Sequence, residues 1–193
     1  MSCRGHTYSA VVIGASAGGL AAVGAVLREL KDSFCLPILL VQHISPSPES
    51  YMATHFDSKS HLSVQEAEDK LPIRRGNMYI APPNYHMMVE VDGCIALSVD
   101  PPVNYSRPLI DVLFETAADY YGPSLVGVVL TGANSDGALG LKKIKQMGGL
   151  AVVQSVESAE AQAMPAAAIE TANVDHILPL DEIGHFLNSL CDC

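Results

Sequence analysis

The chain has few basic residues and no long apolar run, and each shortage excludes a class of protein. Among its 193 residues, 11 are Lys or Arg and 21 are Asp or Glu, so the formal net charge is −10. Nucleic acids and anionic membrane surfaces bind clusters of basic side chains, so neither is an expected partner. No apolar run reaches the roughly 18 residues that cross a bilayer, and we expect no membrane insertion.

The sequence also lacks a secretion signal and a cysteine motif. Arg4 and His6 interrupt the N-terminal segment in which a signal peptide would need its apolar stretch. The five cysteines contain no Cys-x-x-Cys pair. This spacing predicts reduced thiols, no metal centre and a cytoplasmic protein.

Short apolar segments alternate with amphipathic ones along the chain, and the alternation predicts the fold. Apolar, β-branched runs indicate strands over 8–14, 36–43, 124–132, 150–154 and 176–180. Helices are expected over 19–30, 45–56, 107–122, 135–149, 164–173 and from residue 181 onward. In helix 19–30, an apolar stripe at helical spacing is formed by Leu20, Val23, Leu27 and Leu30. In helix 45–56, Ser47 is the expected N-cap and Pro48 lies in the first turn.

The middle of the chain differs, because it carries three short strands over 77–83, 86–91 and 94–100. Asp92-Gly93 joins the last two as a two-residue hairpin turn. Continuous apolar strands alternating with helices predict a parallel sheet covered on both faces. We therefore expect one α/β domain over residues 1–193, with a doubly wound, mostly parallel sheet, helices on both faces and an inserted antiparallel hairpin.

The first strand ends in the turn Gly14-Ala15-Ser16-Ala17-Gly18. A glycine turn between a strand and a helix suits either phosphate binding by helix amides or presentation of a nucleophile. The turn has neither the G-x-G-x-x-G spacing of a dinucleotide site nor the G-K-[ST] of a P-loop. It does match G-x-S-x-G, the elbow that exposes a catalytic serine. The alternative is that Ser16 is only a turn or N-cap residue.

A serine nucleophile needs a base and an acid that orients the base, and both are expected beyond the carboxyl ends of the parallel strands. His43 ends the second strand, and Asp136 follows the strand over 124–132. His43 could instead be a strand-end histidine without catalytic role, and Asp136 could simply cap its own helix. The order Ser, His, Asp differs from the Ser, Asp, His order of α/β-hydrolases, which argues against an ordinary lipase or esterase.

Several blocks together resemble one family. The segments IGASAGGL, LLVQHISP, MYIAPPNYHM, DPPVNYSRPLIDVLF, GVVLTGANSDGALGLKKIKQMGG and SAEAQAMPAAAI occur in the order and spacing of the chemotaxis methylesterase CheB, in its catalytic domain. The resemblance spans about residues 8–180. It implies a doubly wound α/β domain that hydrolyses glutamate methyl esters on chemoreceptors and often deamidates receptor glutamines. It also implies a catalytic triad of Ser16, His43 and Asp136.

The resemblance extends to the rest of the site. Backbone N–H groups of Ala17 and of one residue within 131–134, such as Ala133, would bind the oxyanion. Arg107 and His86 match family positions near the cleft, although a structural role for His86 is equally open. Family members often carry Thr at the position of Ala17 and read GMGND where this chain reads GANSD. We expect retained chemistry without a metal or organic cofactor, and altered substrate contacts.

The expected partner is a methylated chemoreceptor, the protein substrate. CheB proteins usually carry an N-terminal receiver domain, whereas seven residues precede the first expected strand here. Seven residues cannot form a receiver domain, so we expect an open site that is constitutively active or controlled by a separate regulatory chain. Two other functions stay open: a CheB-like scaffolding or binding module, and a hydrolase of small esters in a signalling system.

Overall fold

The structure of the chain, a computed structural model, describes residues 8–43, 51–101 and 107–191. Within these ranges a seven-stranded sheet has the order β3-β4-β2-β1-β7-β8-β9, and all neighbouring strands are parallel. The strands are β1 (Ala10–Ala15), β2 (Ile38–Gln42), β3 (Ser63–Glu66), β4 (Asn77–Ile80), β7 (Leu125–Val129), β8 (Leu150–Gln154) and β9 (His176–Leu178).

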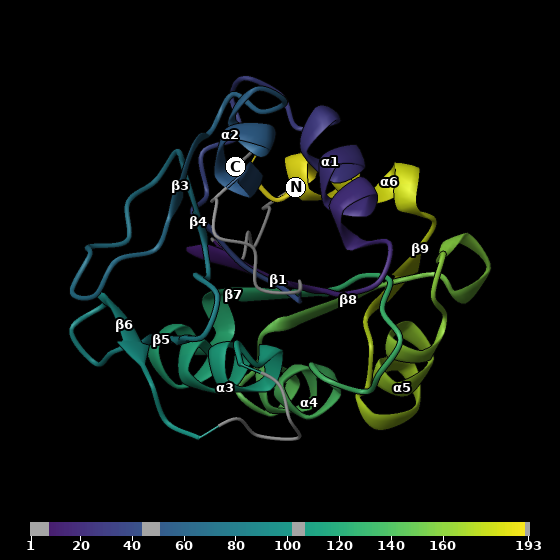
Figure 1. The fold of residues 1–193 in the computed structure, drawn as a ribbon. Coiled ribbons are helices and arrows are strands. Elements are labelled where there is room, and N and C mark those ends of the chain that lie inside the picture. Colours follow the sequence, from purple (N-terminus) through teal and green to yellow (C-terminus); the bar gives the residue numbers. More distant parts are fainter. Residues whose placement is uncertain (1–7, 44–50, 102–106, 192–193) are drawn as a thin grey trace, which may run out of the picture.

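Helices cover both faces of this sheet (Figure 1). One face carries α1 (Gly19–Arg28), α2 (Tyr51–Asp57) and α6 (Leu180–Ser189). The other carries α3 (Ile110–Tyr121), α4 (Ala138–Gln146) and α5 (Ala163–Thr171). Two 3-10 turns, η1 (Gly122–Ser124) and η2 (Val156–Ser158), complete the elements of the sheet domain. The predicted doubly wound α/β architecture is confirmed.

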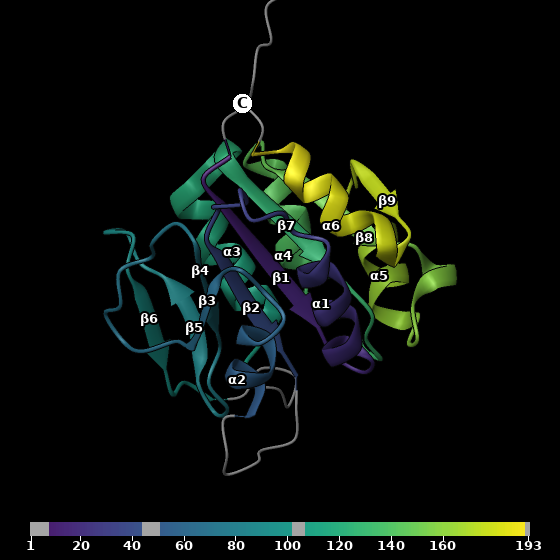
Figure 2. The same cartoon turned by 90° about the horizontal axis from the view of Figure 1, so that it is seen from above.

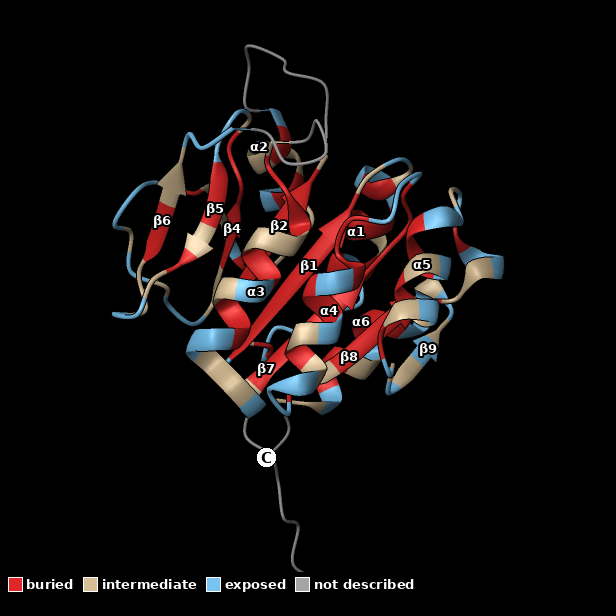
Figure 3. Ribbon diagram, turned by 90° about the horizontal axis from the view of Figure 1, so that it is seen from below, coloured by how far each residue is buried: buried red, intermediate tan, exposed pale blue. Residues whose placement is uncertain are grey.

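The alternation of side chains along β1 explains why two separate cores form. Ala10 and Val12 point into the core beneath α3, α4 and α5, whereas Val11, Ile13 and Ala15 point into the core beneath α1 and α6. Because both faces are covered, every residue of β1 is buried, and apolar residues are favoured at each position. Figure 3 shows the central strands buried, while the helices expose their outer faces.

A small antiparallel hairpin stands apart from the main sheet, as expected. It consists of β5 (His86–Val89) and β6 (Ile95–Ser98) and lies at one side of the molecule (Figure 2). The turn at Asp92-Gly93 forms as predicted: Gly93 has φ 81°, and the Asp92 carboxylate accepts the Cys94 N–H at 2.9 Å. Met87, Val89 and Ile95 pack into the core that contains α3, so the hairpin extends this core beyond the sheet.

Several details differ from the sequence predictions. Strand β3 was not predicted, because SVQE is short, carries one apolar residue and lies half-exposed at the sheet edge. Leu20 was expected in the buried stripe of α1 but is 42% exposed. It lies in the first turn of α1. The predicted N-cap Ser47 and the following Pro48 lie outside the described residues.

One strand and one helix are shorter in the structure than predicted, and in each the lost residues include proline. The strand predicted over 77–83 ends at Ile80, since Pro82 and Pro83 have no N–H to donate to a ladder. The helix predicted over 107–122 begins only at Ile110, after Pro108. None of the helices in the described ranges is long and apolar enough to cross a membrane.

The strand order reverses at the centre of the sheet. From β1 the chain runs outward through β2 to β3 and β4 on one side, and later returns to place β7 against the other side of β1. At such a reversal the loops after neighbouring parallel strands diverge, which leaves a site outside their carboxyl ends. The loops that follow β1, β2 and β7 carry Ser16, His43 and Asp136.

Candidate active site

Ser16 lies on a tight turn that directly follows β1. Its backbone N–H donates to the Thr131 carbonyl at 3.0 Å, and its own carbonyl accepts the Gly19 N–H at 2.8 Å. Gly18 is the N-cap of α1, with φ 76°, a conformation that side-chain-bearing residues rarely adopt. The N-cap of α1 is thus Gly18 rather than Ser16, so the N-cap part of the alternative for Ser16 is wrong.

The hydroxyl of Ser16 makes no hydrogen bond to any residue in the described ranges. Ser16 is partly exposed and Ala17 is exposed, so the turn opens to solvent at the strand ends. This is the arrangement expected of an elbow that presents a nucleophile.

Gln42 connects the turn to the residue that follows β2. Its side chain is buried, and Nε2 donates to the carbonyls of both Ser16 and His43 at 2.8 Å. One amide group therefore fixes the backbone of the serine relative to that of the histidine. Gln42 was not predicted as a site residue from the sequence. A polar residue at the end of the otherwise apolar run ILLVQ is a signal that could have indicated it.

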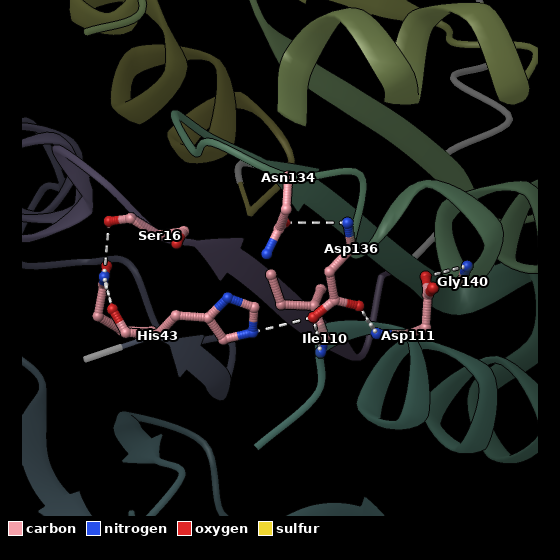
Figure 4. A network of polar contacts seen from close by, with 8 residues as sticks. Ser16, His43, Ile110, Asp111, Asn134, Asp136 and Gly140 are labelled. Atoms are coloured by element: carbon pink, nitrogen blue, oxygen red, sulfur yellow. Dashed lines mark hydrogen bonds and ion pairs between the residues drawn. The ribbon is translucent and has the colours of Figure 1, made fainter. Parts of the chain in front are cut away.

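His43 lies between Ser16 and Asp136 (Figure 4). Its Nε2 lies 2.9 Å from Oδ2 of Asp136, and the two side chains are only 14% and 7% exposed. The ring N–H is not aligned with this oxygen as a hydrogen bond. Such contacts are commonly loose in the absence of substrate.

Asp136 is held by the N-terminus of a helix that is distant in sequence. Oδ2 accepts the Ile110 N–H at 2.7 Å, and Oδ1 accepts the Asp111 N–H at 3.0 Å. These are the first two residues of α3, whose N-cap, Leu109, has no capping side chain. The positive end of the helix dipole suits a carboxylate at this place. The N-cap of α4 is Gly137, without a side-chain cap, so the hypothesis that Asp136 caps its own helix is wrong.

Two of the backbone N–H groups in the loop after β7 already have acceptors, which leaves fewer candidates for an oxyanion site. Thr131 donates its N–H to Oε1 of Gln154, and Gly132 donates to the Ala161 carbonyl. No described residue accepts the N–H of Ala133, and the same holds for Ala17 on the loop after β1. Both residues are exposed. Ala17 and Ala133 therefore keep free donors on the two loops.

Asn134 fixes the path of this loop. Its Oδ1 accepts the Asp136 N–H at 3.1 Å, which closes a short turn just before the acid. The sequence alone does not predict that the Asn134 side chain would bond the backbone of Asp136.

The two further candidates, His86 and Arg107, are not joined to the three residues by any hydrogen bond or ion pair in the described ranges. His86 begins β5 and is 2% exposed, with no described partner at either ring nitrogen. Arg107 donates Nη1 to the carbonyls of Val99 and Asp100, at 2.7 and 3.0 Å. Arg107 therefore contacts the two residues that directly follow β6.

Comparison with known proteins decides the family. A family model described as CheB methylesterase matches residues 11–187. The chain belongs to the CheB methylesterase family. A solved member is the catalytic domain of Thermotoga maritima CheB methylesterase. It superposes with a TM-score of 0.90 at 33% identity, over 95% of this chain and 98% of that one.

Relatives in the CheB methylesterase family carry consistent names. A Leptospira interrogans protein, provisionally named a protein-glutamate methylesterase/protein-glutamine glutaminase, is 49% identical over 92% of each chain. The Anaeromyxobacter dehalogenans protein named protein-glutamate methylesterase/protein-glutamine glutaminase 2 is 41% identical over 97% of this chain and 54% of that protein. The chain thus spans nearly all of one relative and about half of the other.

Proposed function

We propose that this chain is a protein-glutamate methylesterase that hydrolyses glutamate methyl esters on chemoreceptors, with Ser16 as nucleophile, His43 as base and Asp136 as the orienting acid. The observation that carries the proposal is the contact between His43 and Asp136, with a serine hydroxyl that no described residue binds on the opposite side of the imidazole. The names of the relatives supply the substrate class.

The chemistry proceeds in two steps. His43 accepts the Ser16 proton while Oγ attacks the ester carbonyl, and the imidazolium then donates this proton to the leaving methoxide, which departs as methanol. Water next loses a proton to His43 and attacks the acyl-enzyme. Ser16 is regenerated, and the receptor keeps a free glutamate carboxylate.

The two ring nitrogens of His43 have different roles in the proposed mechanism. Nε2 faces Oδ2 of Asp136, so it carries the N–H, and Nδ1 is left to accept the Ser16 proton. Asp136 fixes this tautomer and stabilises the imidazolium that forms. Its carboxylate also accepts two amides of α3, which restricts the rotation of its side chain.

Two backbone groups serve as the proposed oxyanion site. The unused N–H groups of Ala17 and Ala133 lie on the loops after β1 and β7, on which the nucleophile and the acid are also carried. Donors of this kind stabilise the negative charge that develops on the carbonyl oxygen. The small side chains leave both groups exposed to a protein substrate.

The same site supports glutamine deamidation as a second activity, because several relatives carry glutaminase in their names. The acyl-enzyme would be identical, and only the leaving group changes, from methanol to ammonia. His43 would protonate the leaving nitrogen just as it protonates methoxide.

The test is methanol release from a methylated chemoreceptor fragment. We expect wild type to release methanol and Ser16→Ala to lose at least about 10³-fold in kcat, since the members of a triad act as a unit. Ser135→Ala is the matched control, because this serine is exposed on the loop after β7 at the same sheet edge. Methanol release by wild type only from small esters would redirect the proposal to a small-ester hydrolase.

A further inference from the structure

A second carboxylate, that of Asp111, lies beside Asp136 and has no part in the chemistry described above. Asp111 is the second residue of α3, and its Oδ1 accepts the Gly140 N–H at 2.7 Å (Figure 4). Gly140 is the third residue of α4 after the N-cap Gly137. The N–H at this position is the one that an N-cap side chain normally accepts. Gly137 has no side chain, so Asp111 supplies the missing cap from another helix.

The two aspartates therefore cap each other's helices. Asp136 lies just before α4 and accepts the first two N–H groups of α3. Asp111 lies in the first turn of α3 and caps α4. Each carboxylate fixes the helix terminus that carries the other one.

Close packing of α3 and α4 makes this arrangement rigid. A Cβ placed on Gly140 would lie 2.5 Å from Cβ of Phe114 and 3.1 Å from Cα of Asp111. Phe114 is fully buried, so the helices meet without space between them at this point. A displacement of Asp111 is thus transmitted to α4 and to the residue that precedes it.

We propose that Asp111 is a positioning residue for the Asp136–His43 pair: its cap on α4 holds Asp136 in place, and its charge supports the imidazolium of His43. The inference rests on the proposed function, since it assigns Asp111 a role in that same triad. Asp111 touches neither substrate nor reacting atoms. It acts through Asp136.

The electrostatic surroundings of Asp111 support a role for its charge. Partial burial raises the pKa of Asp111 to about 6, and the negative charges of Asp136 and of Glu115 on the same helix add to this rise, while the Gly140 and Gly137 amides oppose it. At neutral pH Asp111 is thus ionised beside Asp136. Both negative charges lie on the same side of the His43 ring (Figure 4), which becomes an imidazolium in the proposed reaction.

Two substitutions separate the cap from the charge. Asp111→Asn keeps an oxygen for the Gly140 N–H and removes the charge, whereas Asp111→Ala removes both. We measure kcat and KM for methanol release between pH 5 and 9, with Glu115→Gln as control. Glu115 is exposed on α3 and has no hydrogen bond to α4 among the described residues.

We expect Asp111→Ala to lower kcat at least about tenfold with KM within about twofold, because Asp136 loses its fixed position. Asp111→Asn should keep kcat within about fivefold at pH 8. Its half-maximal rate should move to lower pH by about 0.3 units or more, since the imidazolium loses a stabilising charge. Glu115→Gln should shift the profile less. A purely structural role would not move the profile of a folded asparagine variant.

The inference is overturned if the Asp111→Asn profile superimposes on that of wild type, or if folded Asp111→Ala keeps kcat within twofold. Should the alanine variant not fold, the asparagine variant decides alone, because it retains the acceptor for Gly140. Absence of methanol release by wild type, or full release by Ser16→Ala, would contradict the proposed function instead. The two failures are therefore distinguishable.

Discussion

Replacing Asp136 by asparagine tests the site and the fold together. Its carboxylate faces three donors: Ile110 N–H and His43 Nε2 at Oδ2, and Asp111 N–H at Oδ1. Asparagine offers one acceptor oxygen and one NH2 group in the same space. Whichever way the amide is oriented, at least one donor faces another donor.

The two orientations have different costs. With the amide oxygen toward His43, the Asp111 N–H loses its acceptor, which costs about 1–3 kcal/mol of stability. With the NH2 toward His43, the imidazole is forced into the tautomer with its proton on Nδ1, and this nitrogen can no longer accept the Ser16 proton. The equivalent change in a serine protease lowers kcat about 10⁴-fold, and we expect a loss of about 10³–10⁴-fold here.

The assay combines methanol release with urea denaturation of the same preparations. From the sequence alone we would expect Asp136→Asn to fold as stably as wild type, but its role as the cap of α3 predicts a loss of about 1–3 kcal/mol. Asp181→Asn is the control, because this exposed aspartate lies in the first turn of α6, with no part in the site. A folded Asp136→Asn variant with kcat within tenfold of wild type would refute the reasoning.

Two further predictions follow from the groups around the triad. Gln42→Met removes the amide that joins Ser16 to His43 and leaves two carbonyls without this donor. We therefore expect kcat for methanol release to fall about tenfold or more, and the free energy of unfolding in urea to drop by about 1–3 kcal/mol. Unchanged values of both quantities would contradict the proposed link. Because the pKa of Asp111 is raised to about 6 in the folded state, the folded protein binds this proton more tightly than the unfolded chain does. The stability of wild type should therefore fall relative to Asp111→Asn as pH rises from about 4 to about 6, and parallel curves would disprove it.

The sequence predicts the fold well where residues are buried on both sides. In β1, β2 and β7 every position is buried, so the apolar runs stand out from their surroundings. Strand β3 has no such signal, since its pairing with β4 depends on the neighbour rather than on its own composition. Leu20 shows the same limit, because helical spacing does not reveal which member of an apolar stripe stays exposed.

The residues proposed for catalysis were predictable because strand ends converge. Ser16, His43 and Asp136 could be selected from their places after three strands, and the contact between His43 and Asp136 agrees with that selection. The supporting groups were not predictable. The cap that Asp111 provides to α4 joins residues 29 positions apart, and it depends on how the two helices pack.

The proposed mechanism depends most directly on Ser16 as the nucleophile. Wild type is treated with a fluorophosphonate, whose phosphorus is attacked by an activated serine Oγ with loss of fluoride, and the adduct is located by mass spectrometry. We predict one adduct, on Ser16, formed in step with the loss of methanol release and abolished in His43→Ala. Loss of methanol release with Ser16 unmodified and another residue labelled, such as Ser135, would contradict the account.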